Sequence, residues 1–362
     1  MKTVADFFAG SGLVSAGLSE YFKTIWANDI DRSKATVYNN NIKDNKIFLE
    51  DIVNINADSV PMADLYWASF PCQDLSLAGN YDGLSGKKSS LVKEFFRIVN
   101  QKPTYDRPEL IVLENVYGLI TSNHGHDYIY IHTLLSELGY RSGAVVIDAS
   151  YWVPQSRVRV FIIAVKKQID ISNYVLNKPN WSHPTALLNI AKKLDDFVFW
   201  NLPEPKTDRK LLRKIIERDA EIDYQKSEHF LNLIPENHRQ ILDKTFQKDE
   251  NLVFAGYKRT RLGKQTLELR FDEIGGCLRT ASGGSSKQLL VFKERNKIVV
   301  RYMTSREAAR LMGAPDKFWL PDNKNEAYTA MGDAVALPVT RFLAKEILSK
   351  LIQQESFCHA YA

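Results

Sequence analysis

Residues 3–12 read TVADFFAGSG, and this stretch is the strongest single indication of the fold. Its first part, Thr3 to Phe8, is apolar and contains β-branched and aromatic side chains, which predicts a buried strand. The strand leads into Gly10 and Gly12, and glycine lets a backbone turn tightly and a ligand approach closely. A helix beginning at Leu13 would direct its first backbone amides at a carboxylate or phosphate. This order of elements predicts a ligand at the carboxyl end of the strand.

Short apolar segments and helical patterns alternate as far as about residue 165. Further strands are expected at 24–28, 64–69, 110–114, 142–147 and 158–165. Helices are expected at 13–22, 33–40, 91–99 and 129–138. This alternation predicts a Rossmann-like α/β fold, with a mixed, mostly parallel sheet and helices on both of its faces.

From about residue 166 to residue 293 polar, charged and loop-like stretches dominate, and they end in a Gly-Gly-Ser-Ser cluster that favours a turn. A helix capped by Thr304 or Ser305 follows, and an amphipathic helix after a turn at 331–333 closes the chain. We therefore expect a large ligand-binding domain of residues 1–175 and 322–362. Residues 176–321 are expected to form a smaller, irregular domain.

The composition is that of an ordinary folded protein, with 44% apolar and 25% charged residues among 362. A net charge of +5 is compatible with a phosphate-bearing partner and equally with a few surplus surface lysines. The sequence has no apolar run of about 18 residues and no signal peptide, which predicts a cytoplasmic protein without a membrane span. Cys72, Cys277 and Cys358 lack metal-ligand spacing, so we expect free thiols and no metal site.

Acidic residues end the next two expected elements. Asp29 ends the second strand, where a carboxylate can accept hydrogen bonds from ribose hydroxyls. Asp51 ends a third element and could hold an adenine amino group. Together with the glycine turn, these residues suit a cofactor that contains adenosine. The third glycine of the dinucleotide fingerprint is missing, which counts against a nicotinamide cofactor.

Two further strand ends carry reactive side chains. Residues 69–76 read SFPCQDLS, so Pro71 fixes a loop that presents Cys72 at the rim of the sheet. A single cysteine there is either an inert thiol or a nucleophile. Residues 113–116 read LENV, and Glu114 is either a plain strand end or a partly buried acid that donates a proton near neutral pH.

Two basic segments complete the candidate residues. In PQSRVR, residues 154–159, alternation along a strand would place Arg157 and Arg159 on one face, either around an anionic group or on a solvated edge. In YKRTR, residues 257–261, an aromatic residue stands beside three basic ones. Such side chains suit guanine edges and phosphates, but a solvated run of charges has the same appearance.

In their order and spacing these motifs resemble the DNA cytosine-5 methyltransferases of bacterial and phage restriction-modification systems. The matching segments are Phe8 to Gly12, Pro71 to Gln73, Glu114 to Val116, Gln155 to Arg159, and Arg306 to Asp316. The resemblance covers essentially the whole chain except residues near 170 to 270. It implies the class I fold that binds S-adenosylmethionine, with residues 176–321 as a target-recognition domain.

The resemblance also implies a role for each candidate residue. The cofactor contacts that it implies are Phe8, Gly10, Ser11, Gly12, Leu13, Asp29, Ile30, Asp51, Ile52 and Pro71. The catalytic residues are Cys72 as nucleophile, with Glu114, Arg159 and Arg157 around the base. The DNA contacts are Gln73, Ser76, Lys258, Arg259, Arg261 and Thr280. The reaction would be methyl transfer from S-adenosylmethionine to carbon 5 of a flipped-out cytosine.

Two segments depart from the family pattern. The chain has Lys87-Lys88-Ser89 where the family often has arginine, and Gly332-Asp333-Ala334 where the family often has Gly-Asn-Ser. The alternatives are a transfer-RNA cytosine methyltransferase of the same fold, a catalytically silent DNA-binding member and a nicotinamide oxidoreductase. The expected partners are duplex DNA and a separate cognate restriction endonuclease, and the expected state is a monomer.

Overall fold

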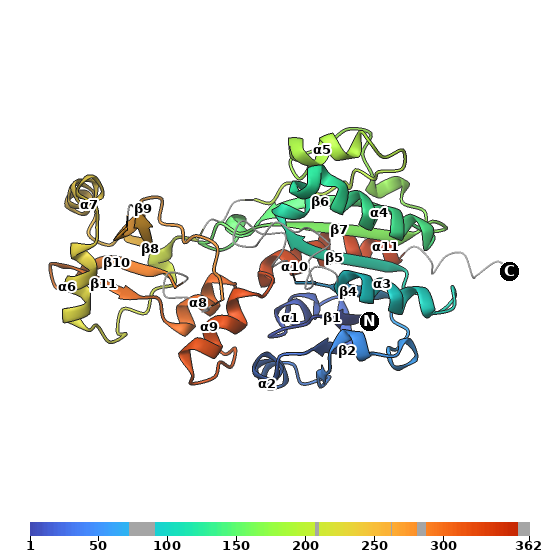
Figure 1. Ribbon diagram of the computed structural model, residues 1–362, viewed down its shortest axis with the longest axis horizontal. Helices are drawn as coiled ribbons and strands as arrows, with labels where there is room; N and C mark the ends of the chain where they lie inside the picture. Colours follow the sequence, from blue (N-terminus) through green and yellow to red (C-terminus); the bar gives the residue numbers. More distant parts are fainter. Residues whose placement is uncertain (72–90, 207–209, 262, 281–286, 354–362) are drawn as a thin grey trace. The chain divides into compact units, whose positions relative to one another are not determined.

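The computed structural model describes residues 1–71, 91–206, 210–261, 263–280 and 287–353, and it divides into two compact units. Unit 1 comprises residues 1–148, 158–205 and 339–362, and unit 2 comprises residues 149–157 and 206–338. Figure 1 shows a large sheet flanked by helices in unit 1 and a smaller sheet in unit 2. Among the described residues, no helix has the length and apolar character needed to cross a membrane.

Unit 1 is built on a seven-stranded sheet in the order β3-β2-β1-β4-β5-β7-β6. The strands are β1 (Lys2–Phe7), β2 (Phe22–Asp29), β3 (Phe48–Leu49), β4 (Leu65–Ala68), β5 (Leu110–Val116), β6 (Tyr140–Asp148) and β7 (Val158–Lys166). The first five run parallel, whereas β7 pairs antiparallel with both β5 and β6. The mixed, mostly parallel sheet predicted from the sequence is confirmed. The carboxyl ends of β1, β2, β4 and β5 and the start of β7 therefore share one edge.

Helices cover both faces of this sheet, and the alternation along β1 shows why. Phe7 points to one face and packs edge-on against Phe95 of α3, with 5.0 Å between ring centroids. Asp6 points to the other face and accepts a hydrogen bond from Ser15 of α1. The helices of unit 1 include α1 (Leu13–Leu18), α2 (Arg32–Asn41), α3 (Leu91–Gln101), α4 (His126–Glu137), α5 (Thr185–Ala191) and α11 (Ser349–Gln353).

Unit 2 contains a four-stranded antiparallel sheet in the order β11-β10-β8-β9. The strands are β8 (Val253–Arg261), β9 (Lys264–Arg270), β10 (Leu289–Glu294) and β11 (Lys297–Tyr302). Its helices include α6 (Tyr224–Asn232), α7 (Glu236–Lys248), α8 (Ser305–Leu311) and α9 (Lys324–Gly332), and the chain passes into unit 1 within α10 (Leu337–Leu343). This region is more regular than its sequence suggested. One face of its hairpins is polar, so the strands do not appear as continuous apolar segments in the sequence.

The units begin and end at other residues than we expected from the sequence. Residues 176–205 belong to unit 1, where Val198 N donates to Ser142 O (3.0 Å) and Trp200 Nε1 donates to Gly143 O (3.2 Å), both on β6. Residues 149–157 and 322–338 belong to unit 2, because Arg157 hydrogen-bonds to carbonyls near the end of α9. Long-range hydrogen bonds of this kind leave no mark in the local composition.

The start of α8 settles which of two residues caps it. The Thr304 side chain accepts from the backbone N of Glu307, and the Glu307 carboxylate accepts in return from the backbone N of Thr304. This reciprocal pair is a capping box, and it satisfies two amides that the helix cannot pair internally. Thr304, and not Ser305, is therefore the N-cap.

Candidate functional site

The carboxyl end of β2 holds the glycine turn that follows β1. Gly10 N donates to Asp29 Oδ2 (2.9 Å), Ala9 N donates to Asn28 O (2.8 Å), and Asp31 N donates to Asp29 Oδ1 (2.9 Å). Burial raises the pKa of Asp29, and these backbone hydrogen bonds act in the opposite direction. The acid predicted to hold a ribose is thus also the residue that orients the glycine turn.

Glycine is needed at the two positions of the turn for different structural reasons. Both have left-handed backbones, with φ of 55° at Gly10 and 86° at Gly12. A Cβ on Gly10 would meet only the Phe8 carbonyl oxygen at 4.0 Å, so the space beside Gly10 is open to a ligand. A Cβ on Gly12 would lie 2.9 Å from Tyr38 Cδ2, so packing against α2 requires this glycine. Of the two, Gly10 therefore leaves the space for a cofactor.

Asn28 is a site residue that the sequence analysis missed. Its buried Nδ2 donates to Phe48 O (3.0 Å) and to Glu50 O (2.8 Å), which ties β3 and the segment before Asp51 to the end of β2. Asp51 in turn accepts from Val53 N (3.1 Å) and caps a short 3₁₀ helix, Ile52–Asn54. In the sequence, Asn28 could have been identified as a polar residue at the end of an apolar strand.

The apolar residues predicted at the cofactor site fall into two groups. Ile30 is 66% exposed beside Asp29, so its side chain is available to a ligand. Ile52, Leu13 and Ser11 are at most 3% exposed, and Ile52 packs in the main core of unit 1. The side chains of these three residues are buried, so the cofactor contacts expected of them would be made by their backbone atoms.

Asp6 is a second residue that we did not predict. Its side chain is completely buried, and Oδ2 accepts from Ser15 Oγ (2.7 Å). The other oxygen, Oδ1, is buried and has no hydrogen-bond partner in the described part of the chain. Burial raises the pKa of Asp6 to about 7, and the nearby Asp29 contributes in the same direction.

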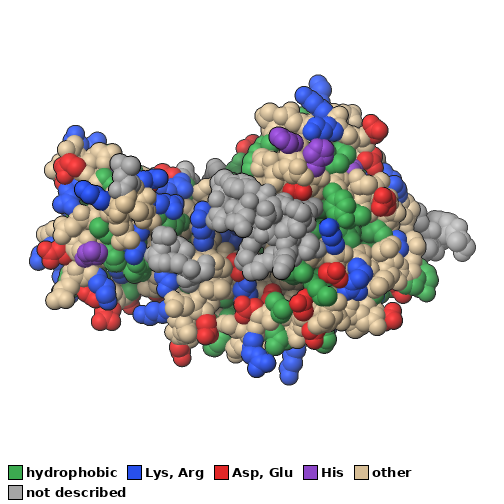
Figure 2. Space-filling view, viewed as in Figure 1, with side chains coloured by type: hydrophobic (Ala, Val, Ile, Leu, Met, Phe, Trp, Pro, Cys, Tyr) green, Lys and Arg blue, Asp and Glu red, His purple; other side chains and the backbone are tan. Residues whose placement is uncertain are grey.

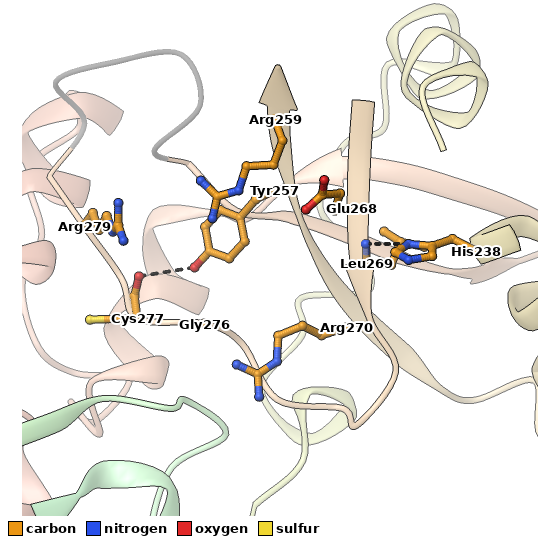
Figure 3. A pocket seen from close by; sticks show the side chains of 9 residues that line it. All are labelled: His238, Tyr257, Arg259, Glu268, Leu269, Arg270, Gly276, Cys277 and Arg279. Carbon is orange, nitrogen blue, oxygen red and sulfur yellow. Dashed lines mark hydrogen bonds between the residues drawn. The ribbon is translucent and has the colours of Figure 1, made fainter. Parts of the chain in front are cut away.

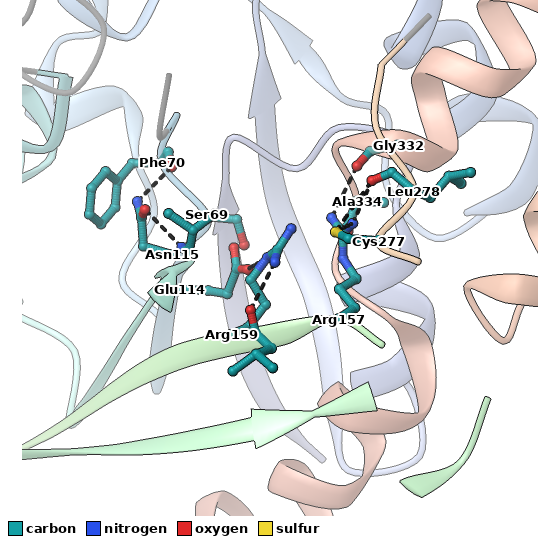
Figure 4. A network of polar contacts seen from close by, with 12 residues as sticks. Ser69, Phe70, Glu114, Asn115, Arg157, Arg159, Cys277, Leu278, Gly332 and Ala334 are labelled. Atoms are coloured by element: carbon teal, nitrogen blue, oxygen red, sulfur yellow. Dashed lines mark hydrogen bonds and ion pairs between the residues drawn. The ribbon is translucent and has the colours of Figure 1, made fainter. Parts of the chain in front are cut away.

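Glu114 and Arg159 meet on neighbouring strands at the same edge of the sheet (Figure 4). Arg159 Nε lies 3.2 Å from Glu114 Oε1, and the two side chains are 14% and 8% exposed. In the antiparallel register Val116 faces Arg159, so Glu114 and Arg159 are diagonal neighbours on one face. The structure thus brings together two of the residues predicted to surround the base.

The segment that leads to the predicted nucleophile is held from β5. Asn115 Nδ2 donates to the carbonyl oxygen of Phe70 (3.1 Å; Figure 4), and Trp67 Nε1 donates to Ser69 Oγ (2.9 Å). Pro71 is the last described residue of this segment. The predicted nucleophile and two predicted DNA contacts lie outside the described residues: Cys72, Gln73 and Ser76.

Arg157 does not share a strand face with Arg159, as the sequence analysis expected. β7 begins at Val158, and Arg157 belongs to unit 2. Its guanidinium donates to carbonyl oxygens of Leu278 (3.0 Å), Gly332 (3.0 Å) and Ala334 (2.6 Å). Arg157 is 2% exposed, so we assign it a structural role within unit 2 and not a contact with the base.

The basic cluster on β8 is split between two faces by strand alternation. Arg259 and Arg261 point to the outer face, where Arg261 Nε pairs with Glu268 Oε1 at 2.7 Å. Lys258 points to the inner face, where its Nζ lies 5.5 Å from the ring centroid of Tyr302. Lys258 therefore does not share a surface with the two arginines, and Thr280 is half-buried on a separate loop. Figure 2 shows other Lys and Arg side chains over the part of unit 2 that carries α7, β8 and β9.

The comparison with known families decides the identity. A family model for C-5 cytosine-specific DNA methylases matches residues 2–349. The chain belongs to this family. It is therefore a DNA cytosine-5 methyltransferase, and its cofactor is S-adenosyl-L-methionine. The DNA substrate predicted from the sequence is favoured over the transfer-RNA alternative.

Individual relatives cover almost the whole methyltransferase. The type II methyltransferase M.Bsp6I of a Bacillus strain is 27% identical over 97% of this chain and 100% of its own length. M.HhaI of Haemophilus parahaemolyticus is 25% identical over 96% of this chain and 94% of its own. The crystal structure of the Schizosaccharomyces pombe Dnmt2 methyltransferase shares the fold, with a TM-score of 0.62 at 18% identity over 99% of this chain and all of its own.

The residues present fit this cofactor. The open space beside Gly10, the Asp29 carboxylate and the exposed Ile30 side chain provide room, a hydrogen-bond acceptor and an apolar surface at one strand end. Within the described ranges, no three His, Cys, Asp or Glu residues are grouped as metal ligands would be.

Proposed function

We propose that methyl transfer takes place at the edge of the unit 1 sheet where β1, β2, β4 and β5 end. The observation that carries this proposal is that the glycine turn bound by Asp29 and the Glu114–Arg159 pair belong to this one edge. In open α/β sheets ligands bind beyond the carboxyl ends of the strands. The cofactor and the base would therefore approach each other there.

At this edge β1 and β2 would hold S-adenosylmethionine, which supplies an electrophilic methyl group when it is bound. Asp29 would accept hydrogen bonds from the ribose hydroxyls, and Asp51 would accept one from the adenine amino group. Phe8 and Ile30 would contact the adenine, and Gly10 leaves room for the methionine part. Backbone atoms at Ser11, Gly12, Leu13, Ile52 and Pro71 complete the proposed contacts.

The proposed nucleophile is the thiolate of Cys72. It adds to carbon 6 of a cytosine that has left the duplex stack, because a stacked base cannot meet both a thiol and a cofactor. As the S–C6 bond forms, the C5=C6 electron pair shifts through the ring toward nitrogen 3, which takes a proton. Carbon 5 then becomes nucleophilic and takes the methyl group, and S-adenosylhomocysteine is left. Loss of the carbon-5 proton to a base restores the double bond and releases the thiolate, while nitrogen 3 returns its proton to the donor.

Glu114 is the proposed proton donor to nitrogen 3, and Arg159 is its partner. The 3.2 Å contact between them fixes the carboxyl group at the edge where the base would enter. The Arg159 guanidinium would also donate to the carbonyl oxygen at ring position 2, where negative charge develops. The hydrogen bond from Asn115 to Phe70 O positions the segment that precedes Cys72.

Unit 2 is the proposed source of DNA sequence contacts, through Arg259, Arg261 and Thr280, while Gln73 and Ser76 would contact the DNA near the extruded base. We further propose that the enzyme acts as a cytoplasmic monomer and protects cellular DNA from a separate cognate restriction endonuclease. The names of relatives such as the type II methyltransferase M.Bsp6I support this last assignment.

The test is transfer of a tritiated methyl group from the cofactor to duplex DNA or to transfer RNA. We expect transfer to DNA alone, loss of transfer in Cys72→Ala, and a loss of about 10²- to 10⁴-fold in Glu114→Gln. Cys358→Ala is the matched cysteine control and should retain full activity. A covalent adduct with 5-fluorocytosine DNA should form in the wild type and not in Cys72→Ala. Full activity of Cys72→Ala would refute the mechanism.

A further inference from the structure

Part of the β8–β9 hairpin extends beyond the sheet of unit 2 as a two-stranded ribbon. β10 pairs with β8 only at residues 253–256, whereas β9 pairs with β8 along residues 255–261. Residues 257–261 therefore have β9 as their strand partner and no second neighbour among the described strands. A ribbon of this width fits the major groove of B-DNA.

The two faces of this ribbon differ in character. Leu267 and Leu269 point inward and pack with Phe230 and Phe254 in the core of unit 2. The outer face carries Tyr257, Arg259 and Arg261 of β8. Glu268 and Arg270 of β9 point to the same face. The inner face is thus used by the core of unit 2, and the outer face carries mostly polar and charged side chains.

A pocket of about 350 Å³ opens on this outer face. Figure 3 shows Arg259 above the ring of Tyr257, Glu268 and Arg270 beside it, and Arg279 on the facing loop. The Tyr257 hydroxyl donates to Cys277 O (3.2 Å), and a Cβ on Gly276 would lie 2.7 Å from that hydroxyl. The loop therefore lies close against Tyr257 and fixes one wall of the pocket.

The charges around the pocket are not equally available to a ligand. Arg270 pairs with Asp272 at 2.7 Å. Glu268 accepts from Arg261 through both oxygens, and each of these oxygens keeps a second lone pair for a ligand. Arg259 and Arg279 form no ion pair with any residue in the described part of the chain. Arg259 lies over Tyr257, with 5.3 Å from its guanidinium carbon to the ring centroid, which holds its planar fork in one orientation.

We propose that this pocket reads a G·C base pair of the recognition sequence through its major-groove edge. Arg259 donates to O6 and N7 of the guanine, and Glu268 accepts from the N4 amino group of the paired cytosine. Arg279 closes the guanine side of the pocket. The inference rests on the proposed DNA methylation, and it assigns specificity to three residues of unit 2.

A base pair fits the pocket better than a backbone phosphate does. Arg261 lowers the pKa of Glu268 by hydrogen-bonding to its carboxylate, so this wall offers an ionised acceptor whose charge Arg261 balances. A cytosine amino group can donate to this acceptor, whereas a phosphate anion has no donor to offer it. Donor and acceptor side by side match the edge of a G·C pair.

The first experiment defines the recognition sequence by bisulfite sequencing of DNA from cells that express the wild type. Purified variants then methylate duplexes in which each position of that sequence is changed in turn. We expect Arg259→Ala to lose about 5- to 150-fold of its discrimination at one G·C position and to keep its discrimination elsewhere. Arg279→Ala should act at the same position. Arg218→Ala removes an exposed arginine of unit 2 outside the pocket and should leave the preference unchanged.

The second experiment replaces the guanine at that position with 7-deazaguanine, which lacks the N7 acceptor. The replacement should lower kcat/KM in the wild type and have little further effect in Arg259→Ala. Cofactor binding and thermal unfolding of each variant show whether it is folded, and Arg259→Lys keeps the charge without the fork.

Three results would overturn the assignment. An equal loss of kcat/KM on all duplexes with a reduced salt dependence would show a phosphate contact. An unchanged preference in Arg259→Ala and Arg279→Ala would show that the pocket reads nothing. A 7-deazaguanine effect that persists in Arg259→Ala would assign N7 to another residue. Absence of DNA methylation by the wild type would instead refute the proposed function.

Discussion

Replacing Asp6 with asparagine should stabilise the protein at high pH and leave its stability at low pH nearly unchanged. Asp6 is completely buried, and only one of its oxygens has a hydrogen-bond donor, Ser15 Oγ. Burial raises its pKa from 3.8 to about 7, so the native state binds a proton more tightly than the unfolded state. Stability is then highest below the unfolded pKa and decreases as the pH rises to about 7.

The size of the effect follows from the shift. Three pKa units correspond to on the order of 4 kcal/mol of unfolding free energy, lost between about pH 4 and pH 7. Asparagine keeps the oxygen that accepts from Ser15 and carries no charge. The variant should therefore be about as stable as the wild type at low pH, where Asp6 is protonated. At pH 8 its free energy of unfolding should exceed that of the wild type by up to about 4 kcal/mol.

Urea unfolding followed by circular dichroism between pH 4.5 and pH 8 measures this difference. The titratable groups that face Asp6 from neighbouring elements are Asp29 on β2, whose charge opposes ionisation of Asp6, and the Tyr38 hydroxyl on α2, whose raised pKa keeps it neutral throughout this range. Asp58→Asn changes an exposed acid of the same unit and serves as the control. A constant difference between Asp6→Asn and the wild type across this range would show that Asp6 is not the titrating group.

Three further substitutions test other parts of the structure. Asp29→Asn should weaken cofactor binding about tenfold or more in calorimetry, because a charged acceptor for the ribose is lost. Thr304→Ala should lower the unfolding free energy of the protein by about 1–2 kcal/mol in urea, while Ser305→Ala changes it little. His132 lowers the pKa of Asp196, so Asp196→Asn should cost less than about 1 kcal/mol at neutral pH, since Asp196 is half-exposed, and nothing once the pH falls below the native pKa.

Local patterns made much of the candidate site predictable. Buried strands that end in a glycine turn, an aspartate or a glutamate place those residues at one edge of a parallel sheet, whatever the rest of the chain does. Gly10, Asp29 and Glu114 were found in this way, and the structure places them at the carboxyl ends of β1, β2 and β5. The alternation of strands and helices predicted a mostly parallel sheet, but the order of the strands and the antiparallel pairing of β7 came only from the structure.

The predictions failed where tertiary contacts decide the position of a side chain. Arg157 and Arg159 stand two residues apart, yet the chain changes units between them, and Arg157 finds carbonyl oxygens more than 100 positions away. The core uses the side chain of Ile52, so the expected cofactor contact of this residue would come from its backbone. Lys258 belongs to the inner face because the register with β9 decides which side chains point outward. No local composition reports such pairings.

Unit 2 is assembled from two pieces of chain, residues 149–157 and residues 206–338, and this has a consequence for building chimaeric enzymes. A transplant of residues 206–338 from another methyltransferase would leave the short first piece behind. Arg157, which stays behind on the short piece, needs three acceptor oxygens from the transplanted segment. These oxygens must lie at positions equivalent to Leu278, Gly332 and Ala334. A donor whose loops cannot offer these oxygens would leave a buried guanidinium unsatisfied, so the graft should carry its own copy of the short piece.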